Sequence, residues 1–78
     1  MKSIKYVINE TLVTVNEDAV ISYGVSCFDN GTEIKKITDL SPVQQDVLSL
    51  VENCNELDLD PSQLTDVAED FIDTTINI

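Results

Sequence analysis

The chain has no histidine, arginine or tryptophan, and no basic residue after Lys36. Without histidine it lacks the commonest general acid–base group and the commonest metal-binding imidazole. Without arginine it lacks the planar fork that suits phosphate and carboxylate groups. Nucleic-acid binding requires the neutralisation of phosphate charge, which a net charge of −11 opposes. We therefore expect no cofactor, no metal ion and no direct contact with nucleic acid.

Cysteines and long apolar runs are also scarce. Cys27 and Cys54 are too few for a disulfide framework, and both fall on apolar faces, where cysteine behaves as a small hydrophobic residue. The amino-terminal residues lack the apolar region and the cleavage site of a secretory signal, and no apolar run has the length of a membrane span. These features predict a cytoplasmic protein with reduced thiols and no membrane contact.

Negative charge is concentrated in the second half of the sequence. Residues 37–78 contain ten carboxylates and no lysine, a net charge of −10, whereas residues 1–36 contain five carboxylates and all four lysines, a net charge of −1. Charge confined to one half of a small fold tends to produce one strongly negative face. The sequence therefore says more about partners than about a reaction.

The first half has the composition of β-strands. A chain of 78 residues is expected to form a single domain over residues 1–78, and residues 4–38 favour a three-stranded antiparallel meander. Strands are predicted over 4–15, 19–28 and 32–38, with the second turn at Asn30-Gly31. The apolar face changes parity near Glu10, which would fit a bulge or a strand buried on both sides, and Gly24 suggests a bulge or a close contact. Tyr6 and Tyr23 are expected at the edge of the core, with hydroxyls reaching water.

The second half has the pattern of two amphipathic helices. Each helix is expected to begin at a capping residue followed by proline and then glutamine at the third helical position: Ser41-Pro42-Val43-Gln44 and Asp60-Pro61-Ser62-Gln63. We predict helices from about residue 42 to 55 and from about residue 61 to 73, joined by a short link that favours antiparallel neighbours. The expected fold class is α+β, in which this helical hairpin (41–73) packs on one face of the sheet. Residues 74–78 would form a tail of β-type composition.

A row of carboxylates on the second predicted helix is the first candidate site. It consists of Asp66, Glu69, Asp70 and Asp73, spaced to lie opposite the apolar stripe. One interpretation is a solvated face that keeps the protein soluble. The last three acids lie near the end of the helix, where the macrodipole disfavours anions by about 0.3–1 kcal/mol each. The alternative is therefore that the row binds a basic protein partner.

The back of the predicted sheet is the second candidate site. Val13, Val20 and Phe28 lie on the face opposite the helices. Since one helical hairpin cannot cover both faces of a sheet, this face would be an exposed apolar patch, which is typical of an interface. We expect a homodimer through the sheet, or through strand addition by the tail at residues 76–78, as one hypothesis.

Other chemistry finds little support in the sequence. Asp58 and Asp60 resemble calcium ligands, but the spacing of a calcium-binding loop is missing and Asp60 is already explained as a helix cap. Glu69 and Asp70 point in different directions on one helix, which does not suit acid–base catalysis in a cleft. We predict a protein that is not an enzyme and has no catalytic residue.

Four segments carry a family resemblance: Tyr23-Gly24-Val25, Cys54-Asn55 at the end of a valine-rich helix, Leu57-Asp58-Leu59-Asp60-Pro61, and Val67-Ala68-Glu69-Asp70-Phe71-Ile72. With them the chain resembles a family of short, uncharacterised acidic proteins from clostridia-like gut bacteria, a domain of unknown function. The resemblance covers most of the chain and is loose in the first strand. It implies a bacterial, cytoplasmic origin and supplies no activity or catalytic residue.

Two functions follow as hypotheses. The first is a small, acidic protein-interaction or regulatory module without enzymatic activity. The second is a nucleic-acid mimic or inhibitor that binds a basic nucleic-acid-binding protein through its acidic helices. The mimic would bind with steep salt dependence, whereas an apolar module would bind through its sheet with weak salt dependence.

Overall fold

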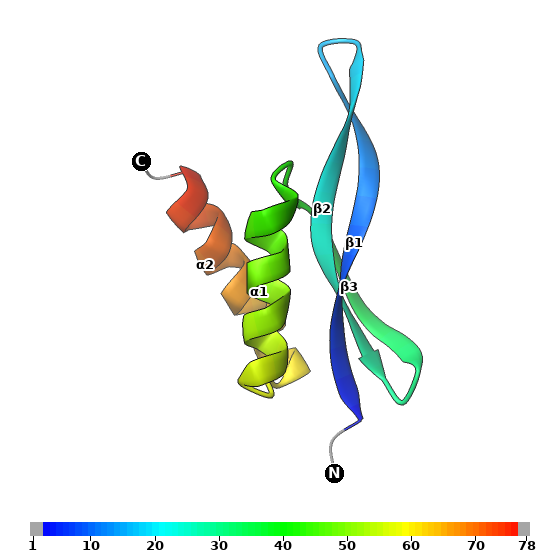
Figure 1. Cartoon of the computed structure of the whole chain (residues 1–78), viewed down its shortest axis with the longest axis vertical. Coiled ribbons are helices and arrows are strands. Elements are labelled where there is room, and N and C mark those ends of the chain that lie inside the picture. Colours follow the sequence, from blue (N-terminus) through cyan, green and yellow to red (C-terminus); the bar gives the residue numbers. More distant parts are fainter. Residues whose placement is uncertain (1–2, 77–78) are drawn as a thin grey trace.

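The fold consists of one antiparallel sheet with two helices on one of its faces. The computed structural model describes residues 3–76, and their side chains as far as residue 72. The strands are β1 (Ile4–Val15), β2 (Asp18–Asp29) and β3 (Thr32–Ser41), in the order β1-β2-β3. They are followed by α1 (Gln44–Glu56), the short 3-10 helix η1 (Pro61–Gln63) and α2 (Leu64–Ile76). Figure 1 shows both helices on the same side of the sheet, which confirms the predicted α+β class.

Both hairpins close through two-residue turns in which the two central residues have positive φ. The values are 50° and 71° at Asn16 and Glu17, and 54° and 86° at Asn30 and Gly31. Positive φ at both central residues defines the type I′ turn, whose twist matches that of the flanking strands. The predicted turn at Asn30-Gly31 is confirmed, and the turn at Asn16-Glu17 is of the same kind.

Neither expectation for the parity change near Glu10 is correct, because β1 has no bulge there and residues 10, 12, 14 and 15 of the strand are exposed. The pairing of β1 with β2 runs without a shift from Ile4 opposite Asp29 to Val15 opposite Asp18. The register shifts lie instead between β2 and β3, where β2 advances two residues, from Tyr23 to Val25, while β3 covers four, from Ser41 to Ile37. The parity change near Glu10 instead coincides with the point beyond which the hairpin no longer pairs with β3.

Gly24 lies where β3 crosses closest to β2. A Cβ atom placed on Gly24 would lie 2.0 Å from the carbonyl oxygen of Ile37 and 2.8 Å from the Cα atom of Thr38. Only glycine permits this approach, so the close contact that the sequence suggested is confirmed. Asn9, opposite Gly24 on β1, donates through Nδ2 to the Ser26 hydroxyl (2.9 Å) and to the Ile37 carbonyl (3.2 Å). The amide side chain therefore links all three strands.

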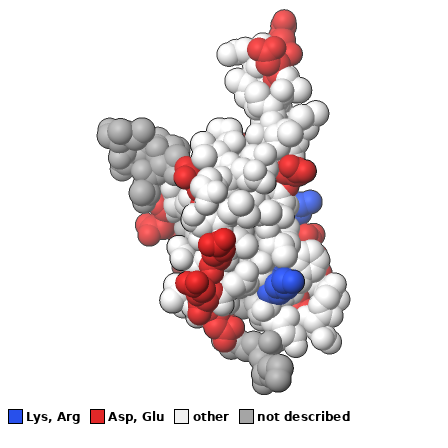
Figure 2. Space-filling model, viewed as in Figure 1, with Lys and Arg blue, Asp and Glu red and all other residues white. Residues whose placement is uncertain are grey.

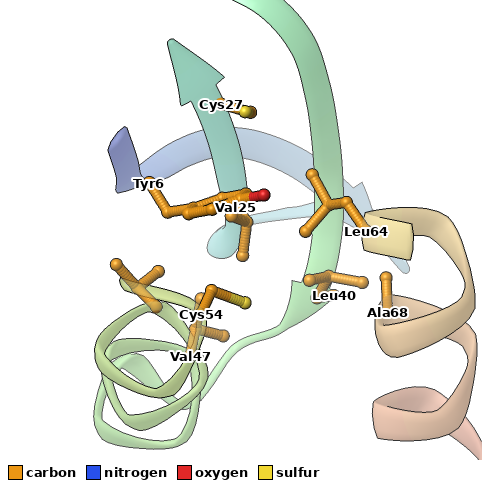
Figure 3. Close-up of a cluster of buried hydrophobic side chains, with 9 residues drawn as sticks. Tyr6, Val25, Cys27, Leu40, Val47, Cys54, Leu64 and Ala68 are labelled. Carbon is orange, nitrogen blue, oxygen red and sulfur yellow. The ribbon is translucent and has the colours of Figure 1, made fainter. Parts of the chain in front are cut away.

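The core lies between the sheet and the helices. Its buried side chains come from every element except η1: Tyr6, Val25, Cys27, Leu40, Val47, Val51, Cys54, Leu64 and Ala68. Figure 3 shows Val47 and Cys54 of α1 on one side of this cluster and Leu64 and Ala68 of α2 on the other, with Leu40 between the helices. Both cysteines are free and buried, as predicted.

Tyr6 corrects the expectation that both tyrosine hydroxyls reach water. Its side chain is only 2% exposed, and its hydroxyl donates to the Leu59 carbonyl at 2.5 Å. This bond ties β1 to the link between the helices. Tyr23 is half-buried.

The two helix starts differ, although their sequences match. Asp60 caps η1 as predicted, because its carboxylate accepts from the Ser62 N–H at 2.9 Å. Ser41, in contrast, is the last residue of β3, and α1 begins at Gln44 without a side-chain cap. The Ser41 hydroxyl accepts from the Val43 N–H instead, at 3.0 Å, so it stabilises the turn before the helix.

The ends of both helices also differ from expectation. After α1, Asp58 has a φ of 52°, with bonds from the Asp58 N–H to the Asn55 carbonyl and from the Leu59 N–H to the Cys54 carbonyl. This is the Schellman pattern, with aspartate at the position usually held by glycine. Helix α2 continues to Ile76, so residues 74–76 are helical and not part of an extended tail. Residues 77 and 78 lie outside the described part of the chain.

Candidate interaction surfaces

The tip of the β1–β2 hairpin projects beyond the rest of the molecule. Pairing between β2 and β3 ends at Tyr23, so residues 11–22 pair only with each other. We call residues 11–22 the arm. Figure 1 shows the arm extending past the start of α1, away from both helices. A two-stranded ribbon without a third strand is marginally stable on its own in water.

Apolar side chains of the arm are exposed on both of its faces. Leu12 and Ile21 are paired on the helix-facing side and are 69% and 47% exposed. Val13 and Val20 are paired on the back, where Val20 is 39% exposed and Val13 is half-buried. Val15, next to the turn, is 52% exposed. Exposed apolar residues gathered in one projecting element are typical of an interface.

The back of the sheet is not the continuous apolar patch that the sequence suggested. Val13 and Val20 lie together in the arm, but Phe28 is eight residues further along β2, about 27 Å away at ~3.4 Å per residue. The small buried residues Ser22, Gly24 and Ser26 separate them. The structure therefore assigns two of the three predicted back-face residues to the arm and places Phe28, half-buried, near the other end of the sheet.

The outer edge of β1 is covered at one position and open beyond it. The Asn55 side chain accepts from the Tyr6 N–H through Oδ1 and donates to the Tyr6 carbonyl through Nδ2, each at 2.9 Å. It therefore pairs with β1 as one residue of a fourth strand would. In an antiparallel pair the backbone groups of alternate residues point away from the neighbouring strand. Since those of Tyr6 point outward, so do those of Ile8, Glu10, Leu12 and Thr14.

The acidic row lies on the surface of α2. Asp66, Glu69 and Asp70 are exposed, and the side chain of Asp73 lies outside what the structure describes. The row belongs to one helix, and both helices lie on the face of the sheet opposite to Val13, Val20 and Phe28. Figure 2 shows acidic side chains over the helical part and also at the tip of the arm.

Two shallow cavities lie beside these surfaces. One, of about 240 Å³, lies between α1 and α2 and is lined by Leu50, Val67, Asp70 and Phe71. The other, of about 190 Å³, lies at the base of the arm, and its lining is formed by Ile8, Asn9, Glu10, Tyr23 and Gln44. The second cavity adjoins the open edge of β1.

The titratable groups of the core are held in their neutral forms. Burial raises the pKa of the Cys27 and Cys54 thiols, and burial likewise raises the pKa of the Tyr6 hydroxyl above its usual range. A thiol with a raised pKa is a poor nucleophile at neutral pH. Among the side chains that the structure describes, no three cysteine or acidic residues are grouped as metal ligands would be. Neither described helix has the length and apolar content needed to cross a membrane.

The arm and the β1 edge were missed by the sequence analysis. Leu12, Ile21 and Asn55 were not singled out. One signal was present, because the first two predicted strands, over residues 4–15 and 19–28, are longer than the third, over 32–38. Strands of unequal length leave part of the longer hairpin without a partner.

An open three-stranded sheet with two helices on one face and a projecting arm defines a small α+β domain. The sequence profile of a family of unknown function, DUF6514, matches residues 2–74. The chain belongs to this family. No curated protein and no solved structure matches the chain.

Proposed function

We propose that the protein is a small, acidic, non-enzymatic interaction module that binds a protein partner through the arm. The observation that supports this most directly is the exposure of Leu12, Ile21 and Val20 in an element that contributes nothing to the core. Exposed apolar side chains cost solubility, and a marginally stable ribbon gains order when a partner covers it.

The setting that we propose is the cytoplasm of a bacterium. Cys27 and Cys54 are buried as free thiols, a state that a reducing compartment maintains. A regulatory role would consist of occupying a surface on the partner, since binding by an exposed arm requires no chemical step.

A pull-down from native cell extract at low and high salt tests this function. We expect wild-type protein to capture a partner at both salt concentrations, and a Leu12→Ser/Ile21→Ser double variant to lose it. Ile34→Ser is the matched control, because Ile34 is an exposed apolar residue outside the arm, 49% exposed. The captured protein is then identified by mass spectrometry, purified, and titrated calorimetrically against all three proteins. Equal affinity for the double variant would contradict a role for the arm.

The second candidate function is a nucleic-acid mimic that blocks a basic protein. It is supported by the exposure of Asp66, Glu69 and Asp70 on α2 and by the position of every lysine before residue 37. In this case capture would fail at high salt, would survive the Leu12→Ser/Ile21→Ser change, and would be lost in an Asp66→Asn/Glu69→Gln variant.

A further inference from the structure

The outer edge of β1 presents a row of unpaired backbone groups along the arm. At Tyr6 the edge is closed by the Asn55 amide. From Ile8 to Thr14 the outward N–H and C=O groups have no hydrogen-bond partner among the described residues. Long open edges pair readily with another extended chain, and native proteins usually cover them or place lysine or proline there. No lysine or proline stands between Tyr6 and Ile34.

The charge around this edge selects the kind of segment that fits it. Glu10 lies on the edge, Glu17 and Asp18 form the tip of the arm, and all three are exposed. Residues 8–25, which comprise this edge and the strand paired with it, contain these three acids and no basic residue. A second copy of the chain would bring a like field of net charge −11 against the same acids, whereas a segment with basic side chains would pair with them.

We propose that the β1 edge from Ile8 to Thr14 binds an extended, lysine- or arginine-bearing segment of a partner protein by β-strand addition. At Ile8, Glu10, Leu12 and Thr14 the added strand makes the same pair of main-chain hydrogen bonds that the Asn55 side chain makes at Tyr6. The cavity lined by Ile8, Glu10 and Tyr23 takes a side chain of the added strand on the helix-facing side. This inference rests on the proposed function and names the chemistry of the partner.

The test uses the full chain and a synthetic peptide in which lysine and valine alternate. Amide hydrogen exchange is followed by NMR with and without the peptide. Exchange at Glu10, Leu12 and Thr14 should slow at least about tenfold on binding, because their N–H groups gain partners. Exchange at Thr11 and Val13, which already bond to β2, should change much less. An absence of protection at millimolar peptide overturns the proposal.

Peptide variants separate the edge bonds from simple charge attraction. A peptide N-methylated at every residue keeps its charge and loses the donors on both of its edges, and a peptide with glutamate in place of lysine reverses the charge. Both should bind about tenfold more weakly or worse. Equal binding of the N-methylated peptide would overturn strand addition, and equal binding of the glutamate peptide would overturn the basic segment.

Protein variants then locate the edge. Leu12→Pro removes an outward N–H on β1 that makes no bond within the arm, and should abolish binding. Ile21→Pro makes the same change on the cross-strand partner of Leu12, whose N–H points to the opposite edge of the arm, and should keep binding. Binding that survives Leu12→Pro and is lost in Ile21→Pro would place the site on β2 and overturn the proposal. If proline unfolds the arm, the N-methylated peptide makes the same test from the ligand side.

A last measurement separates this proposal from the proposed function. Sedimentation of wild-type protein without peptide should show a monomer. A dimer that protects the same amides would make a second copy the occupant and overturn the basic segment. If the captured partner depends on Leu12 and Ile21 but leaves the Glu10 and Leu12 amides unprotected, the arm binds through its faces, so the edge proposal fails while the proposed function stands.

Discussion

Gly24 determines how closely two strands of the sheet can approach. A Cβ atom at this position would lie 2.0 Å from the Ile37 carbonyl oxygen, which is backbone and cannot turn aside. We therefore expect Gly24→Ala to lower the free energy of unfolding by about 2–3 kcal/mol, since overpacking here forces β3 away from β2. Urea denaturation followed by circular dichroism measures the loss.

Ser22 provides the matched control on the same face of the same strand. Its hydroxyl is buried without a hydrogen-bond partner in the described part of the chain. Ser22→Ala should therefore leave stability unchanged or raise it by up to about 1 kcal/mol, because no bond is lost and an unsatisfied polar group is removed. Equal losses for Ser22→Ala and Gly24→Ala would show that the close approach of β3 is not the cause.

At the scale of the element, the two hairpin turns share a backbone shape and differ in sequence. The turn of the arm places Glu17 at a φ of 71°, whereas the second turn places Gly31 at 86°. A left-handed conformation costs a residue with a side chain about 1–2 kcal/mol. Glycine avoids this cost, but it loses more conformational entropy on folding, which offsets part of the gain. We expect Glu17→Gly to stabilise the arm by about 0.5–1 kcal/mol, measured as slower hydrogen exchange of the Val15 amide.

Gly31→Ala is the converse change at the second turn. Nothing lies within 4 Å of a Cβ atom built there, so only the backbone conformation opposes the substitution. A loss of about 1 kcal/mol in the free energy of unfolding is expected. If both substitutions proved neutral, positive φ would not limit the stability of either hairpin.

The elements themselves could be predicted from local sequence, and their ends could not. The alternation of apolar residues in β2 and the stripes of α1 and α2 follow from periodicity alone. The starts of the helices needed tertiary information, because Ser41 and Asp60 carry the same local signal but Ser41 belongs to the bulged end of β3. Asp58 gave no signal of a helix end, since glycine is the usual residue there.

The candidate site was predictable only in part, for a related reason. Val13 and Val20 were placed on one face correctly, because parity determines the face of a strand. Their position in a projecting arm depends on where pairing with β3 ends, which is at Tyr23 opposite Ser41. The pairing of Asn55 with Tyr6 joins residues 49 positions apart, so no local sequence pattern predicts it.

At the scale of the whole molecule, the core should limit stability at alkaline pH. Burial raises the folded-state pKa of Cys27 and Cys54 above the unfolded value of about 8.5. The protonated thiols therefore favour the folded state, and this contribution is complete below the unfolded pKa and is lost as the pH rises toward the folded pKa. The urea midpoint should fall between pH 7 and about 9.5.

A thiol reagent supplies the check on this prediction. Labelling of Cys27 and Cys54 should be slow in the folded protein and should accelerate with urea in parallel with unfolding. Fast labelling at pH 8 in the absence of urea, together with a constant midpoint, would show that the thiols are accessible and that the core is not closed as described.

The projection of the arm affects which amino-acid substitutions the chain can tolerate. Because the arm has no pairing with β3 and adds no side chain to the hydrophobic core, we expect its hydrogen bonds to open while the remainder stays folded, which gives two cooperative units of unequal strength. Substitutions in the stronger unit are then limited by folding and, under the proposed function, substitutions in the arm chiefly by the partner. If the arm binds as proposed, the same folded body can carry arms of different specificity, and a new partner can be acquired with little loss of global stability.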